Sequence, residues 1–244
     1  MSTLELTPDE LAEVLARAEL EVVGRIRYSS NATFLAEVKL DGGSFHAVYK
    51  PRRGERPLWD FPHGTLCQRE VAAYELSRAL GWGIVPVTVM REDGPLGAGA
   101  VQRFVDHDPE EHYFTLLEGH EARFREFAVF DIIANNTDRK GGHCLHDVVN
   151  DVVIGIDHGL TFHSHWKLRT VIWDFAGEPV APALADDVCR VSRDANDGPL
   201  GRRLADLISP QELAALGVRA DDLIRAGRFP EPSPGYHSVP WPMV

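Results

Sequence analysis

The hydrophobic periodicity of the chain changes near residues 105–110 and divides it into two unlike parts. Before that point, short apolar runs are separated by turn signals, of which Asp41-Gly42-Gly43 is the clearest. After it, apolar residues recur at helical spacing, as do Phe127, Phe130 and Ala134. Strands that precede the helices, instead of alternating with them, predict an α+β fold with a mainly antiparallel sheet.

The first part is expected to form a sheet with one internal helix, preceded by a helix that packs on the sheet edge. Thr7 and Glu10 make a capping box with Pro8 at the first helical position. The elements expected next are strands at 22–28, 33–40 and 44–50, a helix at 65–80 closed by Gly81, and strands near 84–90 and 98–105.

The second part is expected to be helical around one short hairpin. A helix is predicted at 121–135, a hairpin at 143–149 and 152–156, and further helices over the remainder. The last fifteen residues hold five prolines and are expected to be extended or disordered. The predicted domains are a β-rich lobe at 1–105, a helical lobe at 106–229 and a proline-rich tail at 230–244. A cleft between two such lobes is a common ligand site.

The composition limits the kinds of partner. The chain has 244 residues, 44% of them hydrophobic, and can bury a core without a disulfide or metal staple. Its net charge of −12 argues against broad attraction to nucleic acid or anionic membranes, so we expect no nucleic-acid partner and no stable membrane association. Three scattered cysteines, with no signal peptide or apolar span, predict a cytoplasmic location.

Lys50 and a helix carboxylate form the first candidate pair. Lys50 ends a mainly apolar strand, from which its ammonium can reach a cleft, although a lysine at a strand end is common. Glu70 lies in the next expected helix and can fix the position of Lys50, and Glu75 of the same helix is a competing partner. A lysine held in this way suits the binding of phosphates.

Two further carboxylates lie on either side of the expected hairpin. Asp138 follows an apolar helix and precedes Lys140 and two glycines, which permit an irregular loop with positive φ. A loop carboxylate can orient or deprotonate a hydroxyl, and Lys140 can neutralise charge on a phosphate. Asp157 ends an apolar strand, where an ionised carboxylate is costly unless it is paired or binds a cation such as Mg²⁺.

Histidines also gather in this region. His143, Cys144 and His146, or His163 and His165, suggest zinc. Their spacings match no zinc finger and no His-Glu-x-x-His motif, so a structural or surface role is favoured for most of them.

Taken in order, several segments resemble the phosphatidylinositol 3-/4-kinase-related branch of the protein-kinase-like superfamily, especially small actinobacterial phosphatidylinositol-kinase-like proteins. The resemblance covers about residues 20–165. The segments that carry it are Ser29-Ser30-Asn31-Ala32-Thr33-Phe34, Ala47-Val48-Tyr49-Lys50-Pro51, Arg69-Glu70-Val71-Ala72-Ala73-Tyr74, Val101-Gln102-Arg103-Phe104-Val105, Asp138-Arg139-Lys140 and Asp157-His158-Gly159.

In the first lobe, the resemblance implies a nucleotide-binding role for five residues. Asn31 is placed in the loop over the phosphates. Lys50 is the lysine that contacts ATP, with Glu70 as its partner. Gln102 and Phe104 lie on the strand that enters the hinge, where backbone groups meet adenine.

In the second lobe, the resemblance places Asp138 and Lys140 in the catalytic loop and Asp157 in the metal-binding Asp-x-Gly triplet. Kinases usually have asparagine five residues after the catalytic aspartate, as a ligand of a second metal. His143 stands at that position, so His143 and Asp157 are the predicted metal ligands.

The resemblance therefore implies a two-lobed protein-kinase-like fold, with an antiparallel β-sheet N-lobe containing one helix and a shortened, mostly helical C-lobe. It implies an ATP-dependent phosphotransferase that uses Mg²⁺ or Mn²⁺ and moves the γ-phosphate to a protein or small-molecule hydroxyl. Three alternatives stay open: a nucleotide-binding pseudokinase that regulates a partner, AMP transfer on the same fold, and a zinc-dependent hydrolase built on the histidines.

Overall fold

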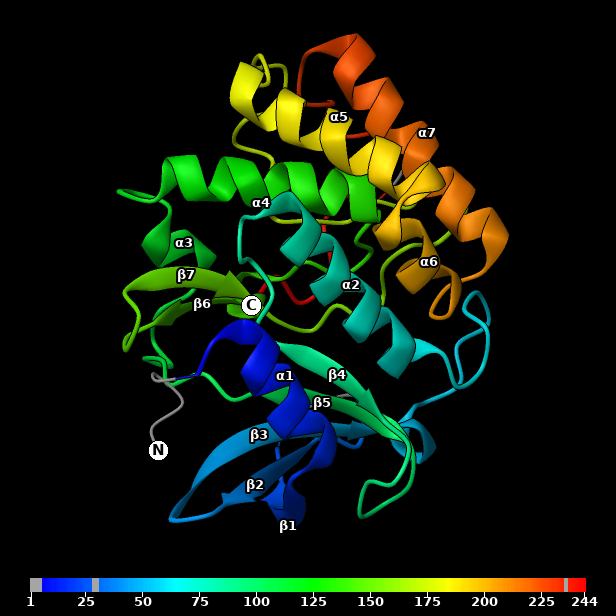
Figure 1. Ribbon diagram of the computed structural model, residues 1–244. Coiled ribbons are helices and arrows are strands. Elements are labelled where there is room, and N and C mark those ends of the chain that lie inside the picture. The colour runs from blue at the N-terminus through cyan, green and yellow to red at the C-terminus, as the bar shows by residue number, and fades with distance from the viewer. Residues whose placement is uncertain (1–5, 28–30, 235–236) are drawn as a thin grey trace.

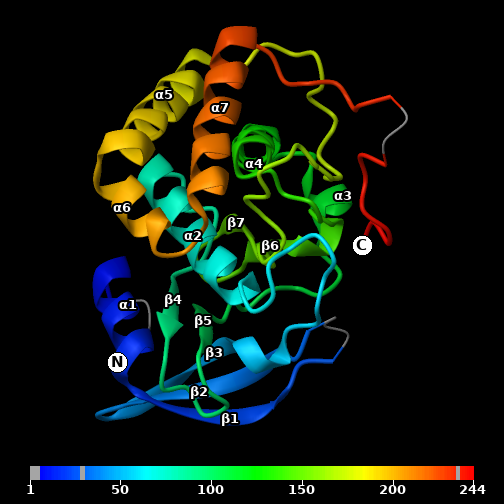
Figure 2. The ribbon, with the colours of Figure 1, turned by 90° about the vertical axis from the view of Figure 1, so that its right-hand side faces the viewer.

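The computed structural model describes residues 6–27, 31–234 and 237–244, so Ser29 and Ser30 of the predicted phosphate-covering loop lie outside the described residues. A β-sheet forms one lobe and a group of helices the other, as Figures 1 and 2 show from two sides. The sheet strands are β1 (Glu19–Arg25), β2 (Phe34–Leu40), β3 (Gly43–Pro51), β4 (Thr88–Arg91) and β5 (Gly99–Arg103).

The five strands pair in the order β1-β2-β3-β5-β4, and every neighbouring pair is antiparallel. The Asp41-Gly42-Gly43 turn sets the register of β2 and β3, in which Leu40 lies opposite Gly43. Helix α1 (Pro8–Arg17) begins at the predicted Thr7 capping box and packs on β4, at the edge of the sheet. The predicted antiparallel sheet is thus confirmed.

Helix α2 (Leu66–Leu80) lies between the sheet and the helical lobe, as Figure 1 shows. It contacts β4 and β5 on one side and two helices of the other lobe on the opposite side, which explains why most of its residues are buried. Gly81 ends it in the left-handed conformation, with φ of +79°, as predicted from the sequence.

The second lobe is mostly helical and contains one short hairpin. Its helices are α3 (Tyr113–Leu116), α4 (Glu121–Ala134), α5 (Pro182–Asp197), α6 (Pro199–Ala205) and α7 (Pro210–Ala226). Its strands are β6 (Cys144–Asp147) and β7 (Val152–Gly155), and the short 3₁₀ turn η3 (Gly141–His143) precedes β6. A second 3₁₀ turn, η2 (Arg52–Gly54), follows β3 in the first lobe. Helix α4 crosses the centre of this lobe with Phe124, Phe127 and Phe130 fully buried.

Two expectations about this lobe are wrong. Residues 157–181 are not helical, because tertiary backbone hydrogen bonds hold this segment against the loop that follows α4, for example from Arg139 N–H to the carbonyl of Arg169 at 3.0 Å. The glycines 141 and 142 do not have positive φ and instead begin η3. Between residues 135 and 157, positive φ is found at Asn135, Asp151 and Asp157.

The segment after α7 contains no helix or strand in the described ranges 227–234 and 237–244. Its end returns to the junction of the two lobes near α3, as Figure 2 shows. None of the helices in the described part of the chain is long and apolar enough to cross a membrane.

Candidate active site

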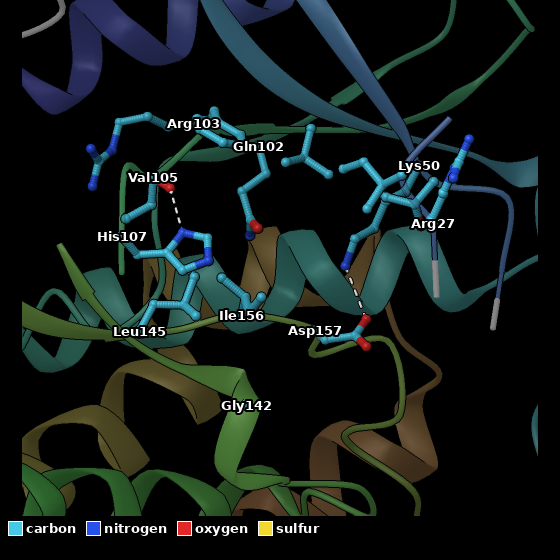
Figure 3. A pocket seen from close by; sticks show the side chains of 14 residues that line it. Arg27, Lys50, Gln102, Arg103, Val105, His107, Gly142, Leu145, Ile156 and Asp157 are labelled. Carbon is cyan, nitrogen blue, oxygen red and sulfur yellow. Dashed lines mark hydrogen bonds and ion pairs between the residues drawn. The ribbon is translucent and has the colours of Figure 1, made fainter. Parts of the chain in front are cut away.

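Lys50, Glu70 and Asp157 meet where the two lobes face each other. Lys50 Nζ lies 2.5 Å from Glu70 Oε1 and 3.1 Å from Asp157 Oδ1, and Figure 3 shows the second contact. The other oxygen of Glu70 accepts a hydrogen bond from the backbone N–H of His158 at 3.0 Å. One lysine and one glutamate therefore join β3, α2 and the loop after β7. Glu75 lies elsewhere and pairs with Arg203 at 2.6 Å.

The charges of this group stabilise one another. Burial alone would lower the pKa of Lys50, but the carboxylates of Asp157 and Glu70 more than offset it and raise that pKa above its usual value. The Lys50 ammonium holds the pKa of Asp157 well below its usual range, although burial acts in the opposite direction. Lys50 and Asp157 are consequently both charged at neutral pH. A cationic lysine can bind phosphate, and an ionised aspartate can bind a cation.

Asp138 and Lys140 lie beside this group, in the loop between α4 and η3. Lys140 Nζ is 3.5 Å from Asp138 Oδ2, and the backbone N–H of Asp138 donates to Asn136 Oδ1 at 3.0 Å. Burial raises the pKa of Asp138, and Lys140 opposes that shift. Asp138 and Asp157 line the same small cavity of about 50 Å³, so both carboxylates face one space.

His143 faces Asp157 from η3. Its Nε2 lies 3.4 Å from Asp157 Oδ2, and burial lowers the pKa of His143 to about 4, so the imidazole is neutral at pH 7. A carboxylate and a neutral imidazole side by side fit a divalent cation that takes its other ligands from phosphates and water. Across the described residues, no group of three or more His, Cys, Asp or Glu side chains is arranged to hold a metal.

The histidines that suggested zinc are engaged in other ways. Cys144 is fully buried in the hydrophobic core. His146 contacts Glu111 Oε2 at 3.1 Å and Asp151 Oδ1 at 2.9 Å. His163 Nδ1 accepts a hydrogen bond from the backbone N–H of His165 at 3.0 Å.

A larger cavity of about 390 Å³ extends from Lys50 and Asp157 along the interlobe junction (Figure 3). Gln102 and Phe104 line it, as do the apolar side chains of Val48 and Ile156. Of the predicted site residues, Asn31, Glu70 and Asp138 line the adjoining small cavity instead. Asn31 Oδ1 accepts a hydrogen bond from the backbone N–H of Arg56 at 2.9 Å, which joins the predicted phosphate loop to the basic loop after β3.

Sequence reasoning missed a buried network beneath the site. Arg139 and Asp131 are fully buried and form an ion pair, with Arg139 Nη2 at 3.0 Å from Asp131 Oδ1. The same guanidinium lies 2.7 Å from His158 Nε2, and Asp131 also accepts from Asn136 Nδ2 at 2.9 Å. The available signal was Asp131 itself, a carboxylate inside an otherwise apolar stretch of α4.

Comparisons with known proteins give one sequence relative and several fold relatives. No protein-family model matches the chain. Protein Rv2133c of Mycobacterium tuberculosis (strain ATCC 25618 / H37Rv) is 42% identical, over 98% of this chain and 97% of its own length.

Kinases are among the similar solved structures. The Golgi casein kinase aligns with a TM-score of 0.58 at 15% identity, covering 89% of this chain and 74% of that chain. Its structure with Mn/ADP bound gives a TM-score of 0.57 at 14% identity, with the same coverage. The Helicobacter pylori proinflammatory kinase CtkA gives 0.51 at 12% identity, covering 88% of this chain and 94% of that chain. Such low identities show the fold alone, and the predicted protein-kinase-like fold is confirmed.

Proposed function

This chain belongs to the family of Protein Rv2133c of Mycobacterium tuberculosis, and we propose that it is an ATP-dependent phosphotransferase. In this proposal it moves the γ-phosphate of ATP to a hydroxyl of a protein or small molecule. The observation that carries the proposal is the contact of Lys50 with both Glu70 and Asp157, beside an interlobe cavity that Lys50 and Asp157 line. The Mn/ADP bound to the Golgi casein kinase supports a nucleotide and a divalent metal as ligands of this fold.

In this mechanism Lys50, fixed by Glu70, binds the phosphates of the nucleotide. Asp157 and His143 would hold Mg²⁺ or Mn²⁺, which neutralises phosphate charge when it is bound. Asp138 orients the acceptor hydroxyl and accepts its proton, a role that its burial and raised pKa favour. Lys140, beside Asp138, stabilises negative charge on the transferred phosphoryl group.

Gln102 and Phe104 contact the base, and Asn31 the phosphates, in the same proposal. We further propose that the chain is related to the phosphatidylinositol 3-/4-kinase-related branch, and the order of the segments that carry the resemblance supports this relation. We propose lobe boundaries at 1–105 and 106–229, which the observed division into a sheet lobe and a helical lobe supports. A tail at 230–244 and a cytoplasmic location are also proposed.

The test follows label from ATP into an acceptor. The full chain is incubated with γ-labelled ATP, Mg²⁺ or Mn²⁺ and a lysate of its own cell, and labelled species are identified. Asp157→Asn should lower the transfer at least about 100-fold, because removal of one aligned charged group costs about 3 kcal/mol in the transition state. Asp151→Asn is the matched control, since Asp151 also has positive φ but lies in the exposed β6–β7 turn.

Two companion experiments separate the alternatives. Label that transfers from α-labelled ATP but not from γ-labelled ATP would assign AMP transfer. Calorimetric binding of ATP without transfer to any species would assign a nucleotide-binding pseudokinase. Transfer that is unchanged in Asp157→Asn would remove the proposed role of the site.

A further inference from the structure

Gln102 lines the larger cavity. It lies on β5, opposite Val48 of β3 and Thr88 of β4, and its side chain is almost completely buried. Figure 3 shows it pointing from the strand into the cavity toward Ile156. Its neighbours in the cavity wall include the apolar side chains of Val48 and Ile156. The end of the amide that Gln102 presents to a ligand therefore decides whether the ligand must donate or accept a hydrogen bond there.

A chain of two hydrogen bonds fixes that orientation. Thr88 Oγ1 lies 2.8 Å from the carbonyl oxygen of Pro86, and a carbonyl can only accept, so the single hydroxyl hydrogen of Thr88 is donated to it. Thr88 Oγ1 can then only accept its second hydrogen bond, which comes from Gln102 Nε2 at 2.8 Å. The amide nitrogen of Gln102 must therefore face Thr88, and the alternative flipped assignment would leave two acceptors in contact.

The carbonyl oxygen of Gln102 is consequently the end left for a ligand. This oxygen makes no hydrogen bond to any described residue, whereas the nitrogen of the same amide donates to Thr88. Val48, Phe104 and Ile156 provide apolar surfaces that suit the faces of a flat ring. The cavity thus places these apolar surfaces beside an amide oxygen whose orientation is fixed.

We infer that Gln102, held by Thr88 and Pro86, selects a 6-aminopurine over a 6-oxopurine in the nucleotide site. This inference rests on the proposed function, and it adds a specificity residue to it. The exocyclic amine of adenine donates to Gln102 Oε1, whereas the 6-oxo group of hypoxanthine or guanine would place a second acceptor against it. A site built to receive an N–H discriminates strongly against a ligand that lacks it, because a buried polar group is then left unpaired.

The test compares ADP with inosine diphosphate, which lacks the 6-amino group but, unlike guanosine diphosphate, carries no 2-amino group. Binding of each to the full chain is measured by calorimetry with Mg²⁺ or Mn²⁺ present. The wild-type chain should bind ADP at least tenfold more tightly. Thr88→Val removes the hydroxyl that orients the amide at nearly constant volume, so the ratio should fall below threefold. Thr88→Ser keeps the hydroxyl and should retain the wild-type ratio.

Gln102→Leu provides a second, independent variant and decides the matter should Thr88→Val fail to fold. It should bind both diphosphates with similar affinity. Equal binding of ADP and inosine diphosphate by the wild-type chain would overturn the inference, as would a preference that survives both Thr88→Val and Gln102→Leu. Absence of any ADP binding by the wild-type chain would instead overturn the proposed function and this inference with it.

Discussion

At the scale of single residues, the candidate site depends on a strained aspartate held by a buried glutamate. Asp157 has φ of +61°, a conformation that costs a residue with a Cβ about 1 kcal/mol or more. Glu70 holds it there, because one carboxylate accepts both the Lys50 ammonium and the N–H of the next residue, His158. The same glutamate therefore positions the lysine and the aspartate relative to each other.

Glu70→Gln keeps the size of this side chain and removes its charge. We expect at least about a tenfold loss of phosphotransfer, because Lys50 then interacts with Asp157 alone and the phosphates lose a fixed cation. Glu75→Gln, in the same helix, is the control and should stay within about twofold of wild type, since Glu75 pairs with Arg203 away from the site. Steady-state assays of phosphotransfer by both variants test this expectation. An equal loss of activity in Glu70→Gln and Glu75→Gln would show that Glu70 has no special role.

The buried histidines predict acid sensitivity. Burial lowers the pKa of His158 well below its usual value and that of His143 to about 4, so the folded state keeps both rings neutral while the unfolded state protonates them below about pH 6.5. The unfolded state then binds more protons, and stability falls as the pH decreases. Between pH 6.5 and 5, each ring should cost about 2 kcal/mol of unfolding free energy.

Urea unfolding at these two pH values measures that loss. His158→Leu should reduce the loss by about half, whatever its effect on absolute stability, because one of the two proton uptakes disappears. His146→Gln is the control. The His146 ring donates hydrogen bonds to the carboxylates of Asp151 and Glu111, which raise the pKa of His146. Its contribution to stability is therefore complete below about pH 6.5 and is lost only as the pH rises through the folded value. A loss unchanged by His158→Leu would contradict the assignment.

At the scale of elements, the end of α4 fixes the loop that carries Asp138 and Lys140. Asp131, one turn before the helix end, accepts from Arg139, Asn136 and Thr170. Asn135 ends the helix in the left-handed conformation and binds the carbonyl oxygens of His163 and His165 through its amide nitrogen. A helix terminus thus fixes both the loop before β6 and the segment after β7.

Asp131→Asn should destabilise the chain by about 3–5 kcal/mol, because it leaves the fully buried Arg139 without a charge partner. Asp222→Asn removes an equivalent charge from an exposed pair with Arg225 at 2.8 Å and should not shift the unfolding midpoint measurably. Chemical denaturation of the two variants is the measurement. Similar midpoints for both would mean that the buried pair contributes little.

The elements also show what the sequence can and cannot predict. Local signals placed the sheet correctly, since Asp41-Gly42-Gly43 and Gly81 act through their own backbone conformations. The prediction of helix at residues 157–181 is wrong, because the contacts of this segment with Asn135 and Arg139 are tertiary. Such contacts leave no periodic pattern in the sequence. For the same reason the Asp131–Arg139 pair was not foreseen. The order of the segments that bear Lys50, Glu70 and Asp157 did predict that these three side chains lie together.

At the scale of the whole molecule, α2 is fixed to both lobes. Arg69 Nη2 lies 2.6 Å from Glu212 Oε1 of α7, with both side chains buried, and Arg69 Nη1 donates to the carbonyl of Thr161 at 2.7 Å. The next residue, Glu70, pairs with Lys50 of the sheet. The helix that carries the glutamate is therefore anchored to the helical lobe, which keeps the Lys50–Glu70 pair formed.

The C-terminal segment is hydrogen-bonded to two loops of the helical lobe. The carbonyl of Met243 accepts from the N–H of Gly141 at 2.6 Å, and that of Ser238 accepts from the N–H of Thr170 at 3.0 Å. A Cβ at Gly141 would lie 3.1 Å from Phe114 and 3.3 Å from the Met243 carbonyl oxygen, so this glycine serves close approach of the chain and not positive φ. The segment contacts the proposed catalytic loop through its main chain.

Removal of residues 237–244 should therefore expose two specific amides. We expect hydrogen exchange at Gly141 and Thr170 to become at least about tenfold faster, because each loses a backbone acceptor, while amides inside α4 keep their protection. Met243→Ala removes only a half-exposed side chain, retains the carbonyl and should leave both rates close to wild type. Exchange measured by NMR on the three proteins makes the comparison. Unchanged rates in the truncated chain would show that water replaces the segment without cost, and faster exchange in Met243→Ala would show that its side chain, not its main chain, holds the segment in place.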